Sequence, residues 1–435
     1  MLENFIRRVQ QRESTIGIIG LGYVGLPLAL KFCGAGFTVT GIDCNEQRIA
    51  RINSGDPILS HLPPQALQHA RASGRFHTTH RFDAVDQLDA IILCVPTPIG
   101  PHREVDMSAV QSAIRSILPH LRRGQLVSLE STVYPGATEE ELATAIASRG
   151  LAVGRDVFGV FSPEREDPGN THFHTGNIPK LVSGITPACR DAGVILYSSV
   201  VEKVVRVESL RVAEMAKMIE NTFRFVNIGL VNELKMIADG MGIDIWEAIR
   251  AASTKPFGYM PFHPGPGLGG HCIPVDPFYL TWKAREHGMT TRFIELAGEI
   301  NGGMPAWVVG KIGTALGDRD KLIHGARILL IGVAYKKNIE DTRESPALEI
   351  IQRLREAKAV VSYSDPYVPN LNVIRGGRID MAALPLTPET VSAADCVVVV
   401  TDHDSIDYEL IQRHASLIVD TRGRFFPGSP NVVGA

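Results

Sequence analysis

The sequence contains little cysteine. Six cysteines occur among 435 residues, without a CxxC pair, and they are scattered as Cys33, Cys44, Cys94, Cys189, Cys272 and Cys396. A disulfide framework needs denser, paired cysteines, and a structural zinc site needs clustered ligands. We therefore expect a protein of a reducing compartment without a metal site.

The sequence also has no large excess of positive or negative charge and no long apolar run. The chain has 44 Lys and Arg against 47 Asp and Glu, a formal net charge of -3. This balance provides no basic field for nucleic acid and no polybasic patch for a membrane surface. No run approaches the ~20 apolar residues of a membrane span, and the start, MLENFIRRVQQREST, has no apolar signal core. These absences predict a cytoplasmic protein with no nucleic-acid or membrane partner.

The chain does contain the alternating pattern of an α/β protein. Apolar runs at 15–20, 38–43, 90–96, 126–132 and 158–164 alternate with helical stretches, which predicts a parallel, doubly wound sheet. A long helical pattern fills 209–240, and strand–helix alternation restarts at Arg327. We predict two Rossmann-like doubly wound domains joined by a long central helix and a helical middle domain, with boundaries 1–205, 206–315 and 316–435. The two α/β domains could be distant versions of one topology.

A glycine motif, GLGYVG at 20–25, directly follows the first apolar run and opens a helix. Gly20 would allow a tight turn, Gly22 a close backbone approach to a pyrophosphate, and Gly25 close packing of helix on strand. Asp43 ends the second strand, where an acidic residue binds the ribose 2′-hydroxyl. A glycine-rich turn of any α/β protein is the alternative. Asp43 favours NAD over NADP, because a carboxylate repels a 2′-phosphate, although Arg48 is nearby.

Polar residues follow three further strands. Thr97 follows an apolar strand in CVPTP and Thr132 follows the next one in LESTVYPG, at strand ends where open α/β sheets bind ligands. SPERED at 162–167 places Glu164, Arg165 and Glu166 at the same edge. A carboxylate there could handle water or protons beside an arginine that holds phosphate or carboxylate. Threonine turn chemistry and a solvated charged loop are the alternatives.

The long helix carries polar residues on one face. Glu214, Lys217, Asn221 and Arg224 are spaced by three, four and three residues. They form either a solvent-facing stripe or, for Lys217 and Asn221, part of a cleft beside the loop that contains Cys272.

That loop reads PGPGLGGHCIPVDP at 264–277 and presents Cys272 behind glycines. A thiolate attacks carbonyl carbon. With a nicotinamide cofactor, it allows an alcohol to be oxidised twice, through an aldehyde, a thiohemiacetal and a thioester, to a carboxylate. A two-electron alcohol dehydrogenase needs no such cysteine. An incidental loop thiol is the alternative.

Taken together, these motifs resemble the UDP-glucose/GDP-mannose dehydrogenase family. GLGYVGLPLA, CVPTP, STVYPGAT, SPERED, EMAKMIENTFR, NEL, PGPGLGGHCIPVDP, YKKNIEDTRESPALEI, SYSDP and VDTRGRF occur in the family's order over the whole chain. The resemblance implies oxidation of the 6-hydroxymethyl of a nucleotide sugar with NAD. It implies an N-terminal NAD domain, a dimerising central helix and a C-terminal UDP-sugar domain, hence a homodimer or larger homo-oligomer. A role in polysaccharide biosynthesis, such as that of lipopolysaccharide O-antigen, would follow.

The resemblance also assigns roles to residues. Cys272 would be the nucleophile, Lys217 would stabilise an oxyanion or shuttle a proton with Asn221 beside it, and Asp276 would act as a base or orient Lys217. Glu164 would serve thioester hydrolysis. The cofactor set is Gly20, Gly22, Tyr23, Val24, Gly25, Asp43, Arg48, Thr97, Thr132 and Arg343, and Thr132 would also lie near catalytic water. The substrate set is Arg165, Glu166, Lys217, Asn221, Arg224, Gly269 and Lys336.

Two departures indicate the substrate branch. UDP-glucose enzymes typically read SPEFLREG, where this chain has Pro168 four residues after Glu164, and GGYCLPKD, where it has GGHCIPVD. The pattern resembles enzymes of N-acetylated UDP-hexosamines, so we expect UDP-N-acetylglucosamine first. UDP-N-acetylmannosamine, UDP-N-acetylgalactosamine and UDP-glucose stay open, as do a two-electron hydroxy-acid dehydrogenase and a non-catalytic nucleotide-sugar sensor.

Overall fold

The computed structural model describes residues 1–56, 59, 62, 64–100, 104–167, 172–270, 272–374, 378–425 and 428–435. They divide into two compact units, Met1–Glu220 with Phe278–Met289, and Asn221–Pro277 with Thr290–Ala435. The predicted boundaries of three domains stay a prediction. Among these residues, none of the helices combines the length and apolar character that a membrane crossing requires.

The described part of the first unit contains an eight-stranded sheet in the order β3-β2-β1-β4-β5-β6-β7-β8. All neighbouring pairs from β3 to β6 are parallel, as predicted. The sequence did not predict that β7 runs antiparallel to β6. The strands are β1 (Thr15–Ile19), β2 (Thr38–Ile42), β3 (Phe76–Thr79), β4 (Ala90–Leu93), β5 (Leu126–Leu129), β6 (Phe158–Phe161), β7 (Lys180–Gly184) and β8 (Val204–Arg206).

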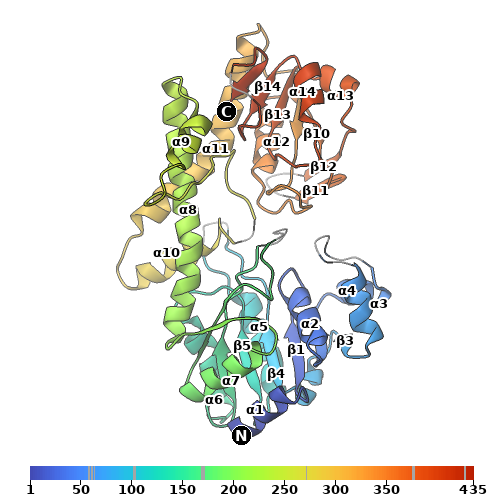
Figure 1. The fold of residues 1–435 in the computed structure, drawn as a ribbon, viewed down its shortest axis with the longest axis vertical. Helices are drawn as coiled ribbons and strands as arrows, with labels where there is room; N and C mark the ends of the chain where they lie inside the picture. Colours follow the sequence, from blue (N-terminus) through green and yellow to red (C-terminus); the bar gives the residue numbers. More distant parts are fainter. Residues whose placement is uncertain are drawn as a thin grey trace. The chain divides into compact units, whose positions relative to one another are not determined.

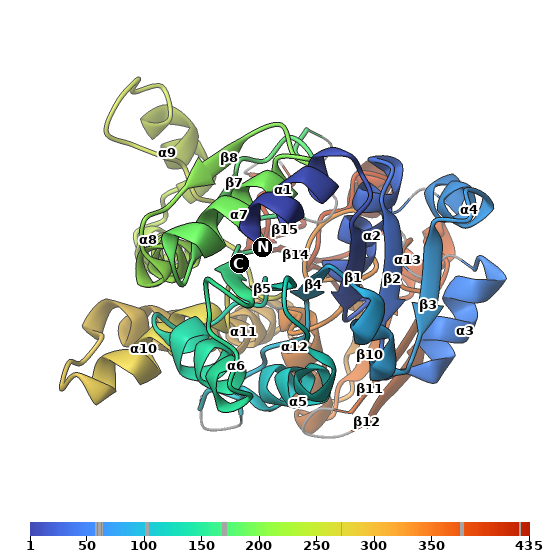
Figure 2. The ribbon, with the colours of Figure 1, turned by 90° about the horizontal axis from the view of Figure 1, so that it is seen from below.

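Helices cover both faces of this sheet (Figure 2). On one face, α1 (Leu2–Gln10), α2 (Gly25–Gly34) and α7 (Pro187–Tyr197) share an apolar core with the central strands. On the other lie α5 (Ser108–Ile117) and α6 (Thr144–Ser148). The remaining helices are α3 (Glu46–Ser54), α4 (Pro64–Ala72) and the short segments η1 (Phe82–Gln87), η2 (Leu118–His120) and η3 (Thr138–Ala143). The doubly wound arrangement is therefore confirmed.

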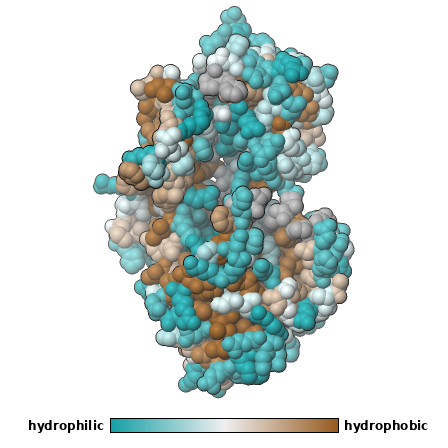
Figure 3. Space-filling view, in the orientation of Figure 1, coloured by the Kyte–Doolittle hydropathy of each residue, from teal (hydrophilic) through white to brown (hydrophobic). Residues whose placement is uncertain are grey.

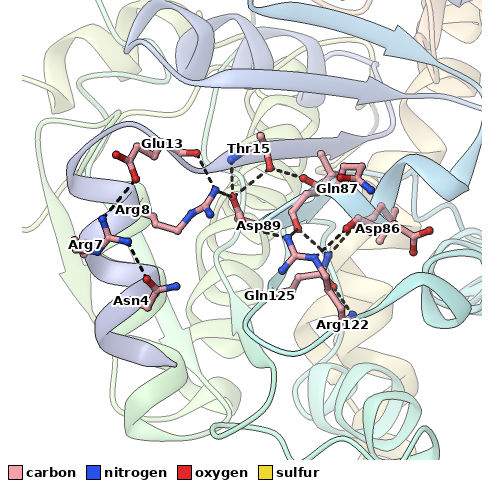
Figure 4. Close-up of polar contacts among 12 residues, drawn as sticks. Asn4, Arg7, Arg8, Glu13, Thr15, Asp86, Gln87, Asp89, Arg122 and Gln125 are labelled. Carbon is pink, nitrogen blue, oxygen red and sulfur yellow. Dashed lines mark hydrogen bonds and ion pairs between the residues drawn. The ribbon is translucent and has the colours of Figure 1, made fainter.

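The N-terminal helix α1 was not predicted, and polar contacts anchor it at the amino edge of the sheet (Figure 4). The Asp89 carboxylate accepts hydrogen bonds from the backbone N–H of Thr15 at 3.0 Å, from Arg8 at 2.7 Å and from Arg122 at 3.0 Å. Phe5 and Val9 of the helix are buried in the core. This edge is opposite to the carboxyl ends of the strands, where the predicted site residues lie.

Two helices, α8 (Leu210–Gly240) and α10 (Asp276–Glu286), continue from one unit into the other. The long helix confirms the pattern at 209–240. The second unit also contains α9 (Ile245–Ala252), α11 (Arg292–Gly317), α12 (Pro346–Glu356), α13 (Pro388–Ser392) and α14 (Tyr408–His414) (Figure 1).

In the described part of the second unit, five parallel strands form a sheet in the order β10-β9-β13-β14-β15. They are β9 (Arg327–Ile331), β10 (Val360–Ser364), β13 (Cys396–Val399), β14 (Ile418–Asp420) and β15 (Val432–Gly434). An antiparallel pair, β11 (Asn370–Ile374) and β12 (Arg378–Ala382), stands apart from it. The prediction of a second α/β domain after a helical middle is confirmed.

The two sheets begin with the same turn. Gly20 follows β1 with φ of 91°, and Gly332 follows β9 with φ of 76°. In each case the next backbone N–H donates to an aspartate just past the adjacent strand: Leu21 to Asp43 at 2.8 Å, and Val333 to Asp365 at 2.7 Å. This correspondence supports a shared topology of the two units.

Candidate active site

The turn between β1 and α2 carries the glycine motif. Gly20 is in the left-handed region, and a Cβ there would lie 2.6 Å from the Cys94 carbonyl oxygen. A Cβ on Gly25 would lie 1.9 Å from the Gly20 carbonyl oxygen, whereas one on Gly22 would meet no atom within 4 Å. Gly20 and Gly25 therefore build the turn, and Gly22 leaves open space beside it.

Asp43 lies at the end of β2 beneath this turn. Its Oδ2 accepts hydrogen bonds from Leu21 N–H at 2.8 Å and Arg48 Nη1 at 3.0 Å, and its Oδ1 from Asn45 N–H at 2.9 Å. Open space at Gly22, the amino terminus of α2 and a fixed carboxylate match the pyrophosphate and ribose of a dinucleotide. The residues present therefore fit NAD.

Thr97 and Thr132 lie just past the neighbouring strands β4 and β5. Thr97 is buried and Thr132 is half-buried. The Ser131 hydroxyl donates to the Val95 carbonyl oxygen at 2.7 Å and joins the two segments. Both threonines thus lie at the carboxyl edge of the sheet, on the same edge as the glycine turn.

Glu214 of α8 fixes the segment after Thr132. It is fully buried, and its carboxylate accepts hydrogen bonds from Gly136 N–H at 2.5 Å, Thr138 N–H at 2.9 Å and the Thr138 hydroxyl at 2.7 Å. Burial raises the pKa of Glu214, although these hydrogen bonds oppose the shift. The solvent-facing interpretation is wrong for Glu214, because the residue anchors a loop.

Lys217 and Asn221 are also buried, whereas Arg224 is exposed. In the first unit, Lys217 Nζ donates to the Glu164 carbonyl oxygen at 2.5 Å. In the second unit, Asn221 Nδ2 donates to Asp276 Oδ2 at 2.5 Å. The buried part of this helix face therefore contacts other predicted site residues instead of solvent.

The SPERED segment is held in place by its neighbours. Glu164 Oε1 accepts hydrogen bonds from the backbone N–H groups of Arg165 at 2.7 Å and Glu166 at 2.6 Å. Arg165 forms an ion pair with Glu220 of α8 at 2.7 Å, and the Thr175 hydroxyl donates to Glu166 at 2.8 Å. Burial raises the pKa of Glu166, and the nearby Glu164 adds to the shift. These contacts argue against a freely solvated charged loop.

The glycines before Cys272 allow the loop to pack against other parts of the second unit. A Cβ on Gly269 would lie 2.5 Å from the Tyr335 Cβ atom, and one on Gly270, where φ is 87°, would lie 2.9 Å from the Tyr335 ring. Gly270 N–H donates to the Arg343 carbonyl oxygen at 3.0 Å. The glycines thus permit a close approach that a larger residue would block.

Cys272 itself is exposed, in the turn that precedes α10. Its carbonyl oxygen accepts hydrogen bonds from Val275 N–H at 3.1 Å and Asp276 N–H at 2.8 Å, and these two bonds fix the backbone at Cys272. Arg343 Nη2 pairs with Asp341 at 2.7 Å, and Lys336 is half-buried just beyond β9. The second unit therefore combines a presented thiol with a segment that carries two cations.

The predicted residues fall into one set in each unit. The first unit contains Gly20, Gly22, Tyr23, Val24, Gly25, Asp43, Arg48, Thr97, Thr132, Glu164, Arg165, Glu166 and Lys217, and the second contains Asn221, Arg224, Gly269, Cys272, Asp276, Lys336 and Arg343. Pro168 and His271, the positions at which the sequence differs from UDP-glucose enzymes, lie outside the described residues.

Sequence reasoning missed a buried polar cluster behind Glu164. It comprises Glu130 after β5, Lys180 at the start of β7, Tyr197 at the end of α7, and Ser128. Glu130 and Lys180 each adjoin an apolar run, LVSL and LVSG, and a charge directly beside such a run was the available signal. The antiparallel direction of β7, which brings Lys180 to this edge, had no such signal.

The geometry of the first unit defines a dinucleotide-binding domain, and comparisons with known proteins extend this to the whole chain. Residues 14–201, 211–302 and 329–427 match the NAD binding, central and UDP binding domains of the UDP-glucose/GDP-mannose dehydrogenase family.

Individual relatives match over most of the chain. A UDP-N-acetyl-D-glucosamine 6-dehydrogenase of Pseudomonas aeruginosa is 40% identical over 359 residues, 82% of this chain and 84% of the relative. A UDP-N-acetyl-D-mannosamine dehydrogenase of Salmonella typhi is 35% identical over 94% of this chain and 99% of the relative. The solved UDP-D-ManNAc dehydrogenase of Pyrococcus horikoshii, at 32% identity, has a TM-score of 0.86 and covers 97% of this chain and 98% of that chain.

These findings define an NAD-dependent UDP-sugar dehydrogenase. The chain belongs to the UDP-glucose/GDP-mannose dehydrogenase family.

Proposed function

We propose that the protein oxidises the 6-hydroxymethyl group of a UDP-N-acetylhexosamine to a carboxylate, with UDP-N-acetylglucosamine as the preferred substrate. The observation that carries the proposal is Cys272, exposed on a backbone fixed by two hydrogen bonds, in a chain with an NAD binding domain. A two-electron alcohol oxidation would not require this thiol.

The chain's residues would share the chemistry. When bound, NAD⁺ accepts a hydride at each of the two oxidation stages. The Cys272 thiolate adds to the aldehyde carbon, and Lys217 stabilises the oxyanion or moves its proton. Asn221 holds Asp276, the candidate base, through the hydrogen bond at 2.5 Å. In the last stage, Glu164 accepts a proton from water as that water attacks the thioester, and the thiolate of Cys272 leaves.

The remaining predicted residues would bind the two ligands. Tyr23, Val24, Thr97, Thr132 and Arg343 would contact the cofactor together with the glycine turn, Asp43 and Arg48. Arg165, Glu166, Arg224, Gly269 and Lys336 would contact the sugar nucleotide. Arg165 is suited to this role because its guanidinium is only partly exposed and already oriented by Glu220.

The choice of sugar rests on sequence and on relatives. Relatives named for UDP-N-acetylglucosamine and for UDP-N-acetylmannosamine both match over most of the chain. We favour the gluco epimer because of the 40% identity to the Pseudomonas aeruginosa relative. The predicted role in polysaccharide and O-antigen biosynthesis stays a prediction.

We also propose a homodimer formed through α8. This helix exposes apolar side chains at intervals of three, four or seven residues, so they form one stripe: Val212, Met215, Ile219, Phe223, Leu230, Leu234 and Ile237. Apolar residues, brown and tan in Figure 3, gather along the side where α8 runs. A second copy would remove this stripe from water.

The test counts NADH formed per sugar consumed with purified protein and UDP-N-acetylglucosamine. We expect two NADH and a carboxylate product. The variant Cys272→Ser should release or retain the aldehyde-stage sugar after one NADH, because a hydroxyl is a far poorer nucleophile than a thiolate. One NADH with an aldehyde product from the wild-type protein would instead favour a two-electron dehydrogenase. No NADH with any of the UDP-sugars, despite tight binding, would favour a sensor.

A further inference from the structure

The antiparallel strand β7 brings Lys180 beside the segment that carries Glu164. Because β6 and β7 run in opposite directions, with Phe161 opposite Ser183, the first residue of β7 faces the residues that follow β6. Two contacts extend this pairing: the Ser162 hydroxyl donates to the Leu181 carbonyl oxygen at 2.8 Å, and Arg165 Nη1 to the Pro179 carbonyl oxygen at 2.5 Å. The position of Lys180 is therefore set by the sheet.

Lys180 belongs to a buried chain of hydrogen bonds. Its Nζ donates to Glu130 Oε2 at 2.8 Å, the Tyr197 hydroxyl donates to Glu130 Oε1 at 2.6 Å, and Ser128 Oγ and Tyr197 share a hydrogen bond of 2.8 Å. The side chains of Lys180 and Glu130 are 6% and 0% exposed. Burying such a pair is costly unless every polar atom is satisfied. Hydrophobic residues would fill the site at a lower cost in folding free energy, so stability alone does not explain why the buried pair of Lys180 and Glu130 is there.

Glu164 provides that explanation. Its Oε1 is held by two backbone N–H groups, whereas its Oε2 is buried and accepts no hydrogen bond among the described residues. The Nζ atom of Lys180 lies 4.0 Å from this Oε2 atom. A fixed carboxylate with one unused lone-pair oxygen, facing a buried cation, is poised to accept a hydrogen bond from water.

We propose that Lys180 is a positioning residue for the water-activating carboxylate of Glu164, with Glu130, Tyr197 and Ser128 holding the ammonium group in place. The inference rests on the proposed function. In the hydrolytic step, Glu164 Oε2 takes a proton from water, the water oxygen bonds to the thioester carbon, and the carbon–sulfur bond of Cys272 breaks. Lys180 faces the unused oxygen of Glu164 and fixes its direction.

The charges around Glu164 support this role. The titratable groups that face it include Lys180 on β7, Glu130 after β5, Cys94 after β4, Glu166 in its own segment and Lys217 on α8. Burial lowers the pKa of Lys180, but the carboxylates of Glu130 and Glu164 outweigh burial and hold that pKa above its ordinary value. Lys180 therefore stays cationic, and it opposes the repulsion between Glu164 and the two other carboxylates.

The test compares Lys180→Met with Lys180→Arg and the double variant Lys180→Met/Glu130→Met. Rapid mixing with NAD⁺ and UDP-N-acetylglucosamine, followed by acid quench and intact-protein mass spectrometry, separates hydride transfer from thioester hydrolysis. We expect hydrolysis to slow about 10- to 100-fold in Lys180→Met, a part of the usual gain from general-base catalysis, with a thioester accumulating on Cys272. Lys180→Arg should largely restore hydrolysis.

The double variant keeps the experiment decisive if Lys180→Met does not fold. Replacing both buried ions by apolar residues is often neutral or stabilising, so a purely structural pair would leave hydrolysis near the wild-type rate. We expect hydrolysis to stay slow, with normal binding of sugar and NAD. Exposed Lys203, which precedes β8, serves as the control, and Lys203→Met should be unchanged.

Hydrolysis within about twofold of wild type in the folded double variant would overturn the role of Lys180. A wild-type protein that forms a single NADH and no adduct on Cys272 would overturn the proposed function and this inference with it.

Discussion

At the scale of single residues, the glycines of the first turn serve different purposes although they share one motif. Gly25 has no room for a side chain, because a Cβ would lie 1.9 Å from the Gly20 carbonyl oxygen. Gly22 has room, because a Cβ would meet nothing within 4 Å. The fold of the turn therefore requires Gly25, whereas for Gly22 we propose that the ligand approaching the turn requires the open space.

This difference gives a matched pair of substitutions. Gly25→Ala should destabilise the first unit by about 1–3 kcal/mol, the usual cost of overpacking. Gly22→Ala should change stability by only about 0.5 kcal/mol, as for exposed positions. It should nevertheless weaken NAD binding about tenfold, since a methyl group would occupy the space for the pyrophosphate, and tenfold is about 1.4 kcal/mol. Thermal unfolding without ligand and NAD titration by calorimetry measure the two effects. A Gly22→Ala protein that binds NAD normally would contradict the assignment of this open space.

The same scale shows which site residues a sequence can predict. Glycines at fixed intervals, Asp43 and Cys272 could be proposed from the sequence because the predicted chemistry requires those residue types at those places. Glu130 and Lys180 were not, because their meaning depends on a partner 50 residues away and on the direction of a short strand. Glu214 was assigned to a stripe with two explanations, and only its contacts with Gly136 and Thr138 reveal that it anchors a loop.

At the scale of elements, α8 has a polar face and an apolar stripe. Buried polar side chains such as Glu214 and Asn232 lie on one side, while Leu230 and Leu234 are 50% and 44% exposed on another. A helix normally turns its apolar residues toward a core. Exposed apolar residues that repeat along so long a helix are therefore the main structural support for association between copies.

We expect Leu230→Glu to weaken the dimer at least about tenfold, because it places a charge in an apolar contact and such contacts dominate binding. Sedimentation equilibrium at several protein concentrations measures the dissociation constant. Glu356→Gln changes an exposed polar residue on α12, outside this stripe, and should have no effect. A Leu230→Glu protein with the wild-type dissociation constant would show that association, if present, uses another surface.

Most elements were predictable from the periodicity of apolar residues. The runs that became β1, β2 and β9 and the helix α8 are long, and they are bounded by turn residues. The elements that escaped prediction have weaker patterns. The helix α1 buries only Phe5 and Val9 in a polar segment, and β8 has three residues, which is too short for an alternation to be recognised.

At the scale of the whole molecule, we expect the acetamido group of the sugar to decide which substrate is oxidised. An acetamido group offers a donor and an acceptor that the glucose hydroxyl cannot replace, and a pocket built to bond it leaves buried groups unpaired when glucose binds. We therefore expect catalytic efficiency to be ~10⁴-fold higher with UDP-N-acetylglucosamine than with UDP-glucose. Initial rates with UDP-glucose and the three UDP-N-acetylhexosamines provide the measurement. Equal efficiency with UDP-glucose would overturn the branch, and preference for another epimer would overturn only the named sugar.

The aspartates that hold the first turn of each sheet, Asp43 and Asp365, differ in a way that bears on the order of steps in a reaction cycle. Asp365 accepts hydrogen bonds from four backbone N–H groups, those of Val333, Ala334, Tyr367 and Val368, and its carboxylate also contacts the fully buried His403. It has no capacity left for a ribose, whereas Asp43 accepts one of its three hydrogen bonds from the side chain of the half-buried Arg48. Only the first unit would then receive a dinucleotide, so an oxidation in two stages has to exchange its spent cofactor in mid-reaction. The covalent bond to Cys272 would act as a tether during that exchange, so that the half-oxidised sugar is not lost while the cofactor departs and is replaced.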